Sequence, residues 1–164
     1  MDQPREADLH ALIAALAAAG VEFIVVGGAA AVLHGAPTAT LDLDVVHRLT
    51  SDNVERLQQL LVRLHAVVRD PAGRDLQPTR EHLAAGGQLQ LITDLGPIDL
   101  LGRLHDGRAY HELLSSSEKI GDEMLEVQVI DLETLIEIKL AANRAKDRLL
   151  LPILLALRDE NNDL

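Results

Sequence analysis

The residues of this sequence with the clearest chemical potential are two aspartates, Asp42 and Asp44, which one leucine separates in the segment TLDLDVV. The alternation of apolar and acidic residues predicts a β-strand, in which side chains two residues apart point to the same face. Two carboxylates on one face suit the binding of a hard divalent cation, because such cations prefer oxygen ligands. An isolated Asp-x-Asp pair also fits a strand whose outer face is acidic.

A third aspartate, Asp99, lies between apolar residues in the later segment PIDLL, which also reads as a strand. Three carboxylates that are brought together repel one another and raise each other's pKa unless a cation compensates their charge. Clustering them is therefore unfavourable without a metal ion and useful with one. If Asp42, Asp44 and Asp99 converge from separate strands, they would form a metal site.

A glycine pair, Gly27 and Gly28, follows the apolar segment 22–26, for which we predict a short strand. Residues 29–34 predict a short helix that Gly35 closes. The free N–H groups and the dipole of this helix would face an anion beside the glycines. A tight turn that requires a positive φ explains the two glycines equally well.

One lysine, Lys139, lies in a helix predicted to start after Asp131, where it continues an apolar stripe formed by Leu132, Leu135 and Ile136. A lysine in such a position either extends its ammonium group to the surface or reaches into a binding site. The helical spacing alone leaves both interpretations open.

These motifs together resemble the nucleotidyltransferase superfamily that includes DNA polymerase β. The family pattern is a strand that ends in Gly-Gly or Gly-Ser, followed about a dozen residues later by an Asp-x-Asp or Asp-x-Glu pair. Thirteen residues separate Gly28 from Asp42 here. The likeness is strongest to small stand-alone members, including AbiEii-like toxins, which carry a Lys followed by an Arg-x-Lys-Asp segment. The matching residues here are Lys139, Arg144, Lys146 and Asp147.

The resemblance implies a Mg²⁺-dependent enzyme that transfers a nucleoside monophosphate from an NTP to a hydroxyl group on RNA such as tRNA, on protein or on a small molecule. Asp42 and Asp44 would hold one Mg²⁺ on the nucleotide phosphates. Asp99 would join them to hold a second ion, which lowers the pKa of the attacking hydroxyl. The residues that would contact the nucleotide are Gly27, Gly28, Thr40 and Lys139. A role in a toxin–antitoxin system would follow from the toxin-like members.

Two positions depart from the family pattern. Gly28 stands where many active members have a serine that contacts the triphosphate, and Thr38 stands where related Gly-Gly families have an arginine before the threonine of the turn. These departures favour an alternative, a catalytically weak or inactive protein of the same fold that binds or regulates a partner. A phosphatase with an Asp-x-Asp nucleophile ranks third, since it requires a larger doubly wound domain.

The composition restricts the class of protein further. The chain has 164 residues, of which 48% are hydrophobic, and this predicts one domain over residues 1–164. A net charge of −11 and only two aromatic residues argue against non-specific DNA or RNA binding, so any nucleic-acid substrate must meet a local basic patch. The absence of cysteine excludes disulfides, thiolate zinc sites and cysteine nucleophiles.

The hydrophobic pattern along the chain predicts an α/β (α+β) fold, with a mixed β-sheet flanked by helices, as in nucleotidyltransferases. The predicted helices cover residues 5–19, 29–34, 53–64, 107–114, 131–143 and 146–158, with one further turn near Glu81. The predicted strands cover residues 22–26, 41–46, 66–69, 88–93, 98–101 and 123–130.

Two apolar segments require separate interpretation. Residues 9–33 are hydrophobic, but glycines and Glu22 interrupt them and acidic residues precede them, so we predict a cytoplasmic protein without a membrane span. The last helix is apolar nearly all round, which predicts burial in the core or a homodimer surface. Pro152 lies within it and predicts a kink or a restart.

Overall fold

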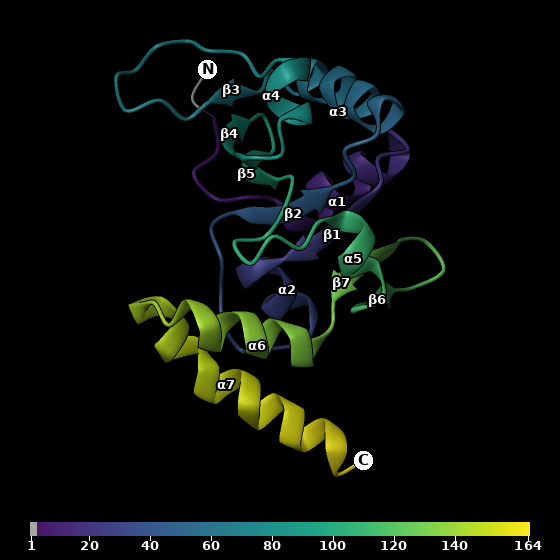
Figure 1. Ribbon diagram of the computed structural model, residues 1–164, viewed down its shortest axis with the longest axis vertical. Helices are drawn as coiled ribbons and strands as arrows, with labels where there is room; N and C mark the ends of the chain where they lie inside the picture. Colours follow the sequence, from purple (N-terminus) through teal and green to yellow (C-terminus); the bar gives the residue numbers. More distant parts are fainter. Residues whose placement is uncertain (1–2) are drawn as a thin grey trace.

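The protein is built on a seven-stranded mixed sheet with the strand order β3-β4-β5-β2-β1-β7-β6 in the computed structural model, which describes residues 3–164 (Figure 1). This sheet and its flanking helices confirm the predicted fold class. The strands are β1 (Phe23–Val26), β2 (Leu43–His47), β3 (Val67–Val68), β4 (Gln88–Thr93), β5 (Gly96–Leu101), β6 (Ser117–Gly121) and β7 (Glu126–Ile130). The helices are α1 (Leu9–Ala18), α2 (Gly27–Leu33), α3 (Ser51–Arg63), α4 (Arg80–Ala84), α5 (Tyr110–Leu114), α6 (Leu132–Ala142) and α7 (Ala145–Asn162).

Strands β1, β2 and β5 form the centre of the sheet and determine where the acidic residues lie. β1 pairs antiparallel with β2, and β2 pairs parallel with β5 in a register that places Asp44 opposite Asp99. The apolar residues of these strands are buried, with Ile24, Val45 and Leu100 fully inaccessible. An apolar composition is expected here because a central strand with helices nearby is covered on both faces. The core therefore fixes the backbone from which the two aspartates project.

The first helix begins later than the predicted residue 5. Asp8 caps α1 by accepting a hydrogen bond from the amide of Ala11, as its position suggests. The amides of Ala7 and Asp8 bond instead to the distant carbonyl groups of Leu41 and Leu95. These long-range bonds hold the entering chain in an extended path, so the helix starts at Leu9.

Two other elements differ from the sequence prediction. Helix α2 begins at Gly27, so the glycine pair forms its first turn and does not lie ahead of it. Strand β6, which begins at Ser117, was not predicted. β6 pairs antiparallel with β7 at an exposed edge of the sheet, where a strand needs no apolar pattern. The predicted strand 123–130 is shorter because Asp122 caps a turn that includes Met124.

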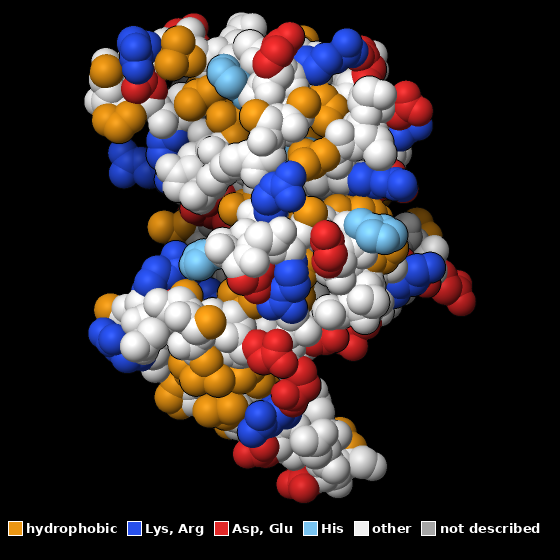
Figure 2. All heavy atoms as spheres, in the orientation of Figure 1, with side chains coloured by type: hydrophobic (Ala, Val, Ile, Leu, Met, Phe, Trp, Pro, Cys, Tyr) orange, Lys and Arg blue, Asp and Glu red, His pale blue; other side chains and the backbone are white. Residues whose placement is uncertain are grey.

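Helices α6 and α7 pack against each other at one end of the molecule (Figure 1). Asp131 caps α6, as predicted, by accepting a bond from the amide of Thr134. Helix α7 runs through Pro152 as one element and does not restart there. Figure 2 shows hydrophobic side chains gathered over these two helices, whose exposed leucines include Leu140 and Leu149.

Within residues 3–164, no helix combines the length and the apolar composition that crossing a bilayer would require.

Candidate active site

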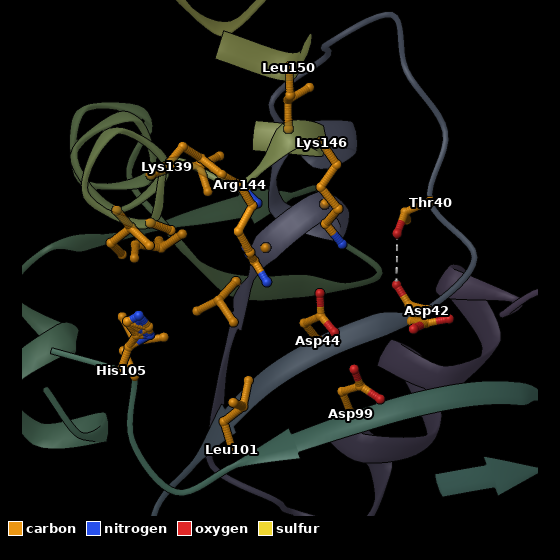
Figure 3. Close-up of a pocket in the computed structure, with 18 of the residues that line it drawn as sticks. Thr40, Asp42, Asp44, Asp99, Leu101, His105, Lys139, Arg144, Lys146 and Leu150 are labelled. Atoms are coloured by element: carbon orange, nitrogen blue, oxygen red, sulfur yellow. Dashed lines mark hydrogen bonds between the residues drawn. The ribbon is translucent and has the colours of Figure 1, made fainter. Parts of the chain in front are cut away.

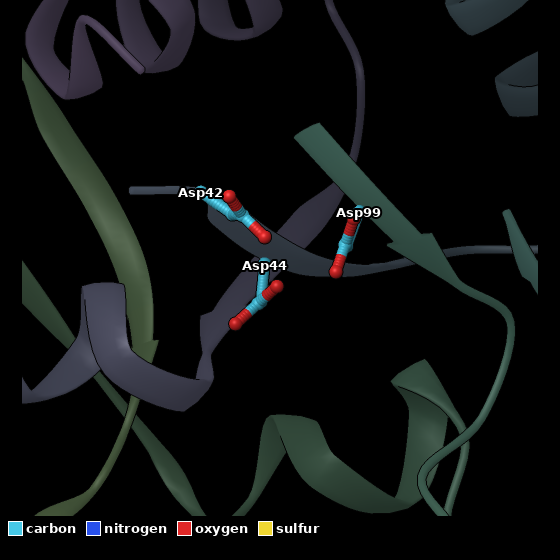
Figure 4. A group of neighbouring side chains, drawn as sticks. All are labelled: Asp42, Asp44 and Asp99. Carbon is cyan, nitrogen blue, oxygen red and sulfur yellow. The ribbon is translucent and has the colours of Figure 1, made fainter. Parts of the chain in front are cut away.

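Three carboxylates from two neighbouring strands meet at one point on the sheet (Figure 4). Asp44 and Asp99 are direct neighbours in the parallel pairing of β2 with β5, and Asp42 lies just before β2, two residues from Asp44. One carboxylate oxygen from each residue lies within 4.8 Å of those from the other two. The convergence predicted from the sequence is therefore present, and we call Asp42, Asp44 and Asp99 the acidic triad.

The surroundings of Asp44 and Asp99 disfavour ionisation of these two carboxyl groups in the absence of a cation. Burial raises the pKa of Asp44 to about 7, with further contributions from Asp99 and Asp42, while the charge of Lys146 acts in the opposite direction. Burial and the charge of Asp42 also raise the pKa of Asp99. Within the described residues, the buried Oδ1 atom of Asp99 has no hydrogen-bond partner. An oxygen cluster with an unsatisfied buried acceptor fits a hard divalent cation.

The two glycines allow other groups to approach the start of α2. Gly27 has a φ of +63°, and a Cβ atom at this position would overlap the carboxylate oxygen Oδ2 of Asp44. A Cβ atom at Gly28 would lie 3.0 Å from Oγ1 of Thr40. The Thr40 hydroxyl donates a hydrogen bond of 3.2 Å to the carbonyl group of Asp42 (Figure 3). The positive φ supports the turn interpretation for Gly27, and the nucleotide contacts of Gly27, Gly28 and Thr40 stay predictions.

The acidic triad lies in a cavity of about 990 Å³ (Figure 3). Five of the fifteen lysine and arginine residues line this cavity, against four of the 26 acidic residues, so its charge differs from that of the whole chain. The basic residues are Arg5, Arg69, Lys139, Arg144 and Lys146. Apolar side chains of α7 form another part of the lining, among them Leu149, Leu150 and Ile153. The cavity therefore offers a basic surface beside the carboxylates and an apolar surface next to it.

Lys139 does not extend to the surface, since its side chain is only about 6% exposed. Its ammonium nitrogen Nζ lies 3.0 Å from Oδ1 of Asp147, which is fully buried. Arg144 donates to the other oxygen of Asp147 from Nε at 2.9 Å and from its backbone amide at 3.1 Å. Burial alone would raise the pKa of Asp147, but the hydrogen bonds from Arg144 and Lys139 outweigh it and hold the pKa at about 2. The predicted contact of Lys139 with a triphosphate stays a prediction.

Three further residues near the acidic triad were not assigned to the site from the sequence. Arg69 lies 3.9 Å from Oδ1 of Asp42, and Gln90 of β4 is the register partner of Asp99. Lys146 points from the first turn of α7 toward Asp44 (Figure 3). Counting along the predicted strands 88–93 and 98–101 could have found Gln90. Lys146 lies in the Arg-x-Lys-Asp segment noted in the sequence but was given no role, and no local pattern marks Arg69.

Comparisons with known proteins bear on the fold. No protein-family model matches the chain, and no curated protein matches its sequence. TM1012 of Thermotoga maritima, provisionally described as a nucleotidyltransferase, matches with a TM-score of 0.55 and 18% identity, over 95% of this chain and 91% of that chain.

The lincosamide antibiotic adenylyltransferase LnuA, solved with lincomycin bound, matches with a TM-score of 0.64 and 10% identity. This match covers 94% of the present chain and 99% of LnuA. At such low identities the likeness shows the fold and not the activity. The chain has a nucleotidyltransferase-like fold, as its Gly-Gly and Asp-x-Asp motifs indicate.

Proposed function

We propose that this protein is a nucleotidyltransferase, which moves a nucleoside monophosphate from an NTP to a hydroxyl group. The observation that carries the proposal is the convergence of Asp42, Asp44 and Asp99 within 4.8 Å, inside a cavity that basic residues also line. The nucleotidyltransferase-like fold supports it. In this reaction the acceptor oxygen forms a bond to the α-phosphorus, the bond from that phosphorus to the bridging oxygen breaks, and pyrophosphate leaves.

The acidic triad would hold the two Mg²⁺ ions that the sequence resemblance implies. Bound ions would supply positive charge at the phosphates and lower the pKa of the acceptor hydroxyl. The basic residues Arg69, Arg144 and Lys146 line the same cavity and would attract the polyphosphate. Asp99, which belongs to the acidic triad, would take the proton of the acceptor hydroxyl as pyrophosphate leaves.

For the acceptor we propose a small, partly apolar molecule that carries a hydroxyl group. The structure of LnuA contains lincomycin, and the present chain aligns with nearly the whole of that protein. The apolar side chains of Leu150 and Ile153, which line the cavity, would contact such an acceptor beside the carboxylates. A net charge of −11 disfavours a large nucleic acid. The competing proposal is a hydroxyl group on tRNA or on protein, and a screen of acceptors would distinguish it from a small molecule.

Several finer predictions rest on the sequence alone. These are an AbiEii-like subtype, a role in a toxin–antitoxin system, a cytoplasmic location and a single domain over residues 1–164, of which residues 1 and 2 lie outside the described part. They stay predictions.

The proposed activity can be tested with each of the four labelled NTPs in the presence of Mg²⁺. We expect release of pyrophosphate and transfer of the label to a member of a panel of small hydroxyl compounds, tRNA and cellular protein. Isothermal titration calorimetry with the same nucleotides measures binding separately. Absence of binding at millimolar nucleotide would contradict the proposal, and release of phosphate in place of pyrophosphate would favour the phosphatase.

The raised pKa of Asp44 predicts how Mg²⁺ affects stability at different pH values. Without metal, the folded state retains a proton on Asp44 up to about pH 7, because the pKa is raised, whereas the unfolded state loses this proton near the ordinary aspartate pKa of 3.8. The stability of the metal-free protein should therefore fall as the pH rises between these values. Mg²⁺ binds the ionised carboxylates, so it should raise the Tm by more at about pH 8 than at about pH 5. Differential scanning fluorimetry with and without millimolar Mg²⁺ measures this difference, and an equal shift at both pH values would contradict it.

We also propose that the protein associates with a second copy of itself through the hydrophobic surface of α6 and α7. Leu149 is 78% exposed and Leu140 is 58% exposed, and burying both side chains against a second copy would be favourable. Sedimentation velocity should show a concentration-dependent dimer that Leu140→Glu weakens. A monomer at high concentration would reject this prediction.

A further inference from the structure

A buried ion pair connects α6 to the first turn of α7. Lys139 of α6 and Asp147 of α7 lie 3.0 Å apart between Nζ and Oδ1, with side-chain exposures of about 6% and 0%. A buried charge that loses its partner is strongly destabilising, so this pair holds the two helices in one relative position. The ammonium group of Lys139 is thereby engaged by Asp147, although Lys139 also lines the cavity.

The short connection between the helices is also held by Asp147. Asn143 ends α6 in the left-handed conformation, with a φ of 47°. The next residue, Arg144, donates to Asp147 from both its backbone amide and its side chain. Asp147 therefore fixes the start of α7 as well as its contact with α6.

Lys146 immediately precedes Asp147, so the same contacts determine its direction. Its side chain is exposed in the cavity, and Figure 3 shows its ammonium group pointing toward Asp44. Within the described residues, no carboxylate lies within salt-bridge distance of Lys146. Lys146 thus presents a cation toward the acidic triad, whereas Lys139 is engaged inside the protein.

We propose that Lys146 binds the polyphosphate of the nucleotide and that Lys139 is a positioning residue, which acts on Lys146 through Asp147. This inference rests on the proposed function, because it assigns two residues of the same site. It replaces the direct triphosphate contact that the sequence resemblance implies for Lys139.

Binding of tripolyphosphate with Mg²⁺, measured by isothermal titration calorimetry, tests the role of Lys146 without requiring the correct base or acceptor. Lys146→Met should weaken this binding by about tenfold or more without lowering the Tm, because the side chain is exposed. Lys119→Met is a matched control on the exposed strand β6, outside the cavity, and should bind as the unaltered protein does. Equal binding by Lys146→Met and the unaltered protein would overturn the inference.

A double-mutant cycle tests the role of Lys139. Lys139→Gln should lower the Tm and weaken tripolyphosphate binding, but it should weaken binding no further when Lys146→Met is already present. The pair Lys139→Gln with Asp147→Asn replaces the ion pair by two amides that can bond to each other, and it should restore both the Tm and the binding. Recovery of the Tm without recovery of binding would show that Lys139 contacts the phosphate itself.

These experiments distinguish a wrong function from a wrong assignment of Lys146. If the unaltered protein binds neither tripolyphosphate nor any of the four NTPs with Mg²⁺, the proposed function fails and the inference fails with it. If the unaltered protein binds them and Lys146→Met does so equally well, the function stands and the assignment of Lys146 is wrong.

Discussion

Replacing Asp44 with asparagine is expected to reduce the rate of nucleotidyl transfer by about three orders of magnitude. The substitution removes one of three negative charges at the predicted metal site and leaves the shape of the side chain almost unchanged. Losing a single group that stabilises the transition state commonly reduces kcat by about 10² to 10³. Pyrophosphate release with saturating NTP and Mg²⁺ measures the effect.

The same variant should be more stable than the unaltered protein when metal is absent. At about pH 8 the Asp44 carboxylate is ionised beside two others in a buried position, and asparagine removes this repulsion. The Tm without metal should therefore rise, and its increase with Mg²⁺ should shrink. Asp75→Asn, in the exposed loop before α4, is the control and should leave rate and Tm unchanged. Pyrophosphate release near the normal rate in Asp44→Asn would exclude an essential role for the acidic triad.

Gly27→Ala should impair both stability and activity, since this position has two separate requirements for glycine. Its φ of +63° is unfavourable for alanine by roughly 1–2 kcal/mol. The added methyl group would also overlap the Asp44 carboxylate, which must then move. A displacement of about 1 Å in a reacting group can reduce the rate about 10²-fold, so we expect a loss of at least that size. Rate measurements and denaturant unfolding at the same pH separate the two effects.

Gly35→Ala provides the matched control for the backbone requirement. Gly35 has a φ of +93°, but a Cβ atom there would meet nothing within 4 Å. Gly35→Ala should therefore lower the free energy of unfolding and leave the rate nearly normal. If both alanine variants show the same loss of rate, the proximity of Gly27 to Asp44 does not explain the effect.

The local elements near the site could largely be predicted from the sequence, because they depend on patterns that span a few residues. The alternation in 88–93 and 98–101 predicts strands β4 and β5, and Asp131 caps the helix that was predicted to start after it. Strand β6 was missed because its partly exposed side chains need no apolar alternation. Residues 5–8 were wrongly predicted to be helical, because no local pattern reveals that the amides of Ala7 and Asp8 bond to the carbonyl groups of Leu41 and Leu95.

The composition of the site was harder to predict, because it depends on contacts between distant segments. The family resemblance predicted that Asp99 lies beside Asp42 and Asp44. In the structure, the parallel pairing of β2 with β5 places Asp99 opposite Asp44, more than fifty residues away in the sequence. Helical spacing placed Lys139 on the inward side of α6, where it is buried. Spacing could not show that Asp147, from the next helix, would bind its ammonium group, or that Lys146 would point toward Asp44.

Because Asp44 and Asp99 are register partners, the acidic triad can form only when β2 and β5 pair in the correct register. Successive side chains of a strand point to opposite faces, so a slip of β5 by one residue against β2 would turn Asp99 to the other side. A molecule with such a slip could retain much of its secondary structure yet could not gather three carboxylates around one ion. If metal binds as we propose, it will therefore select correctly paired molecules from a refolding mixture, and retention of Mg²⁺ will distinguish them from slipped ones.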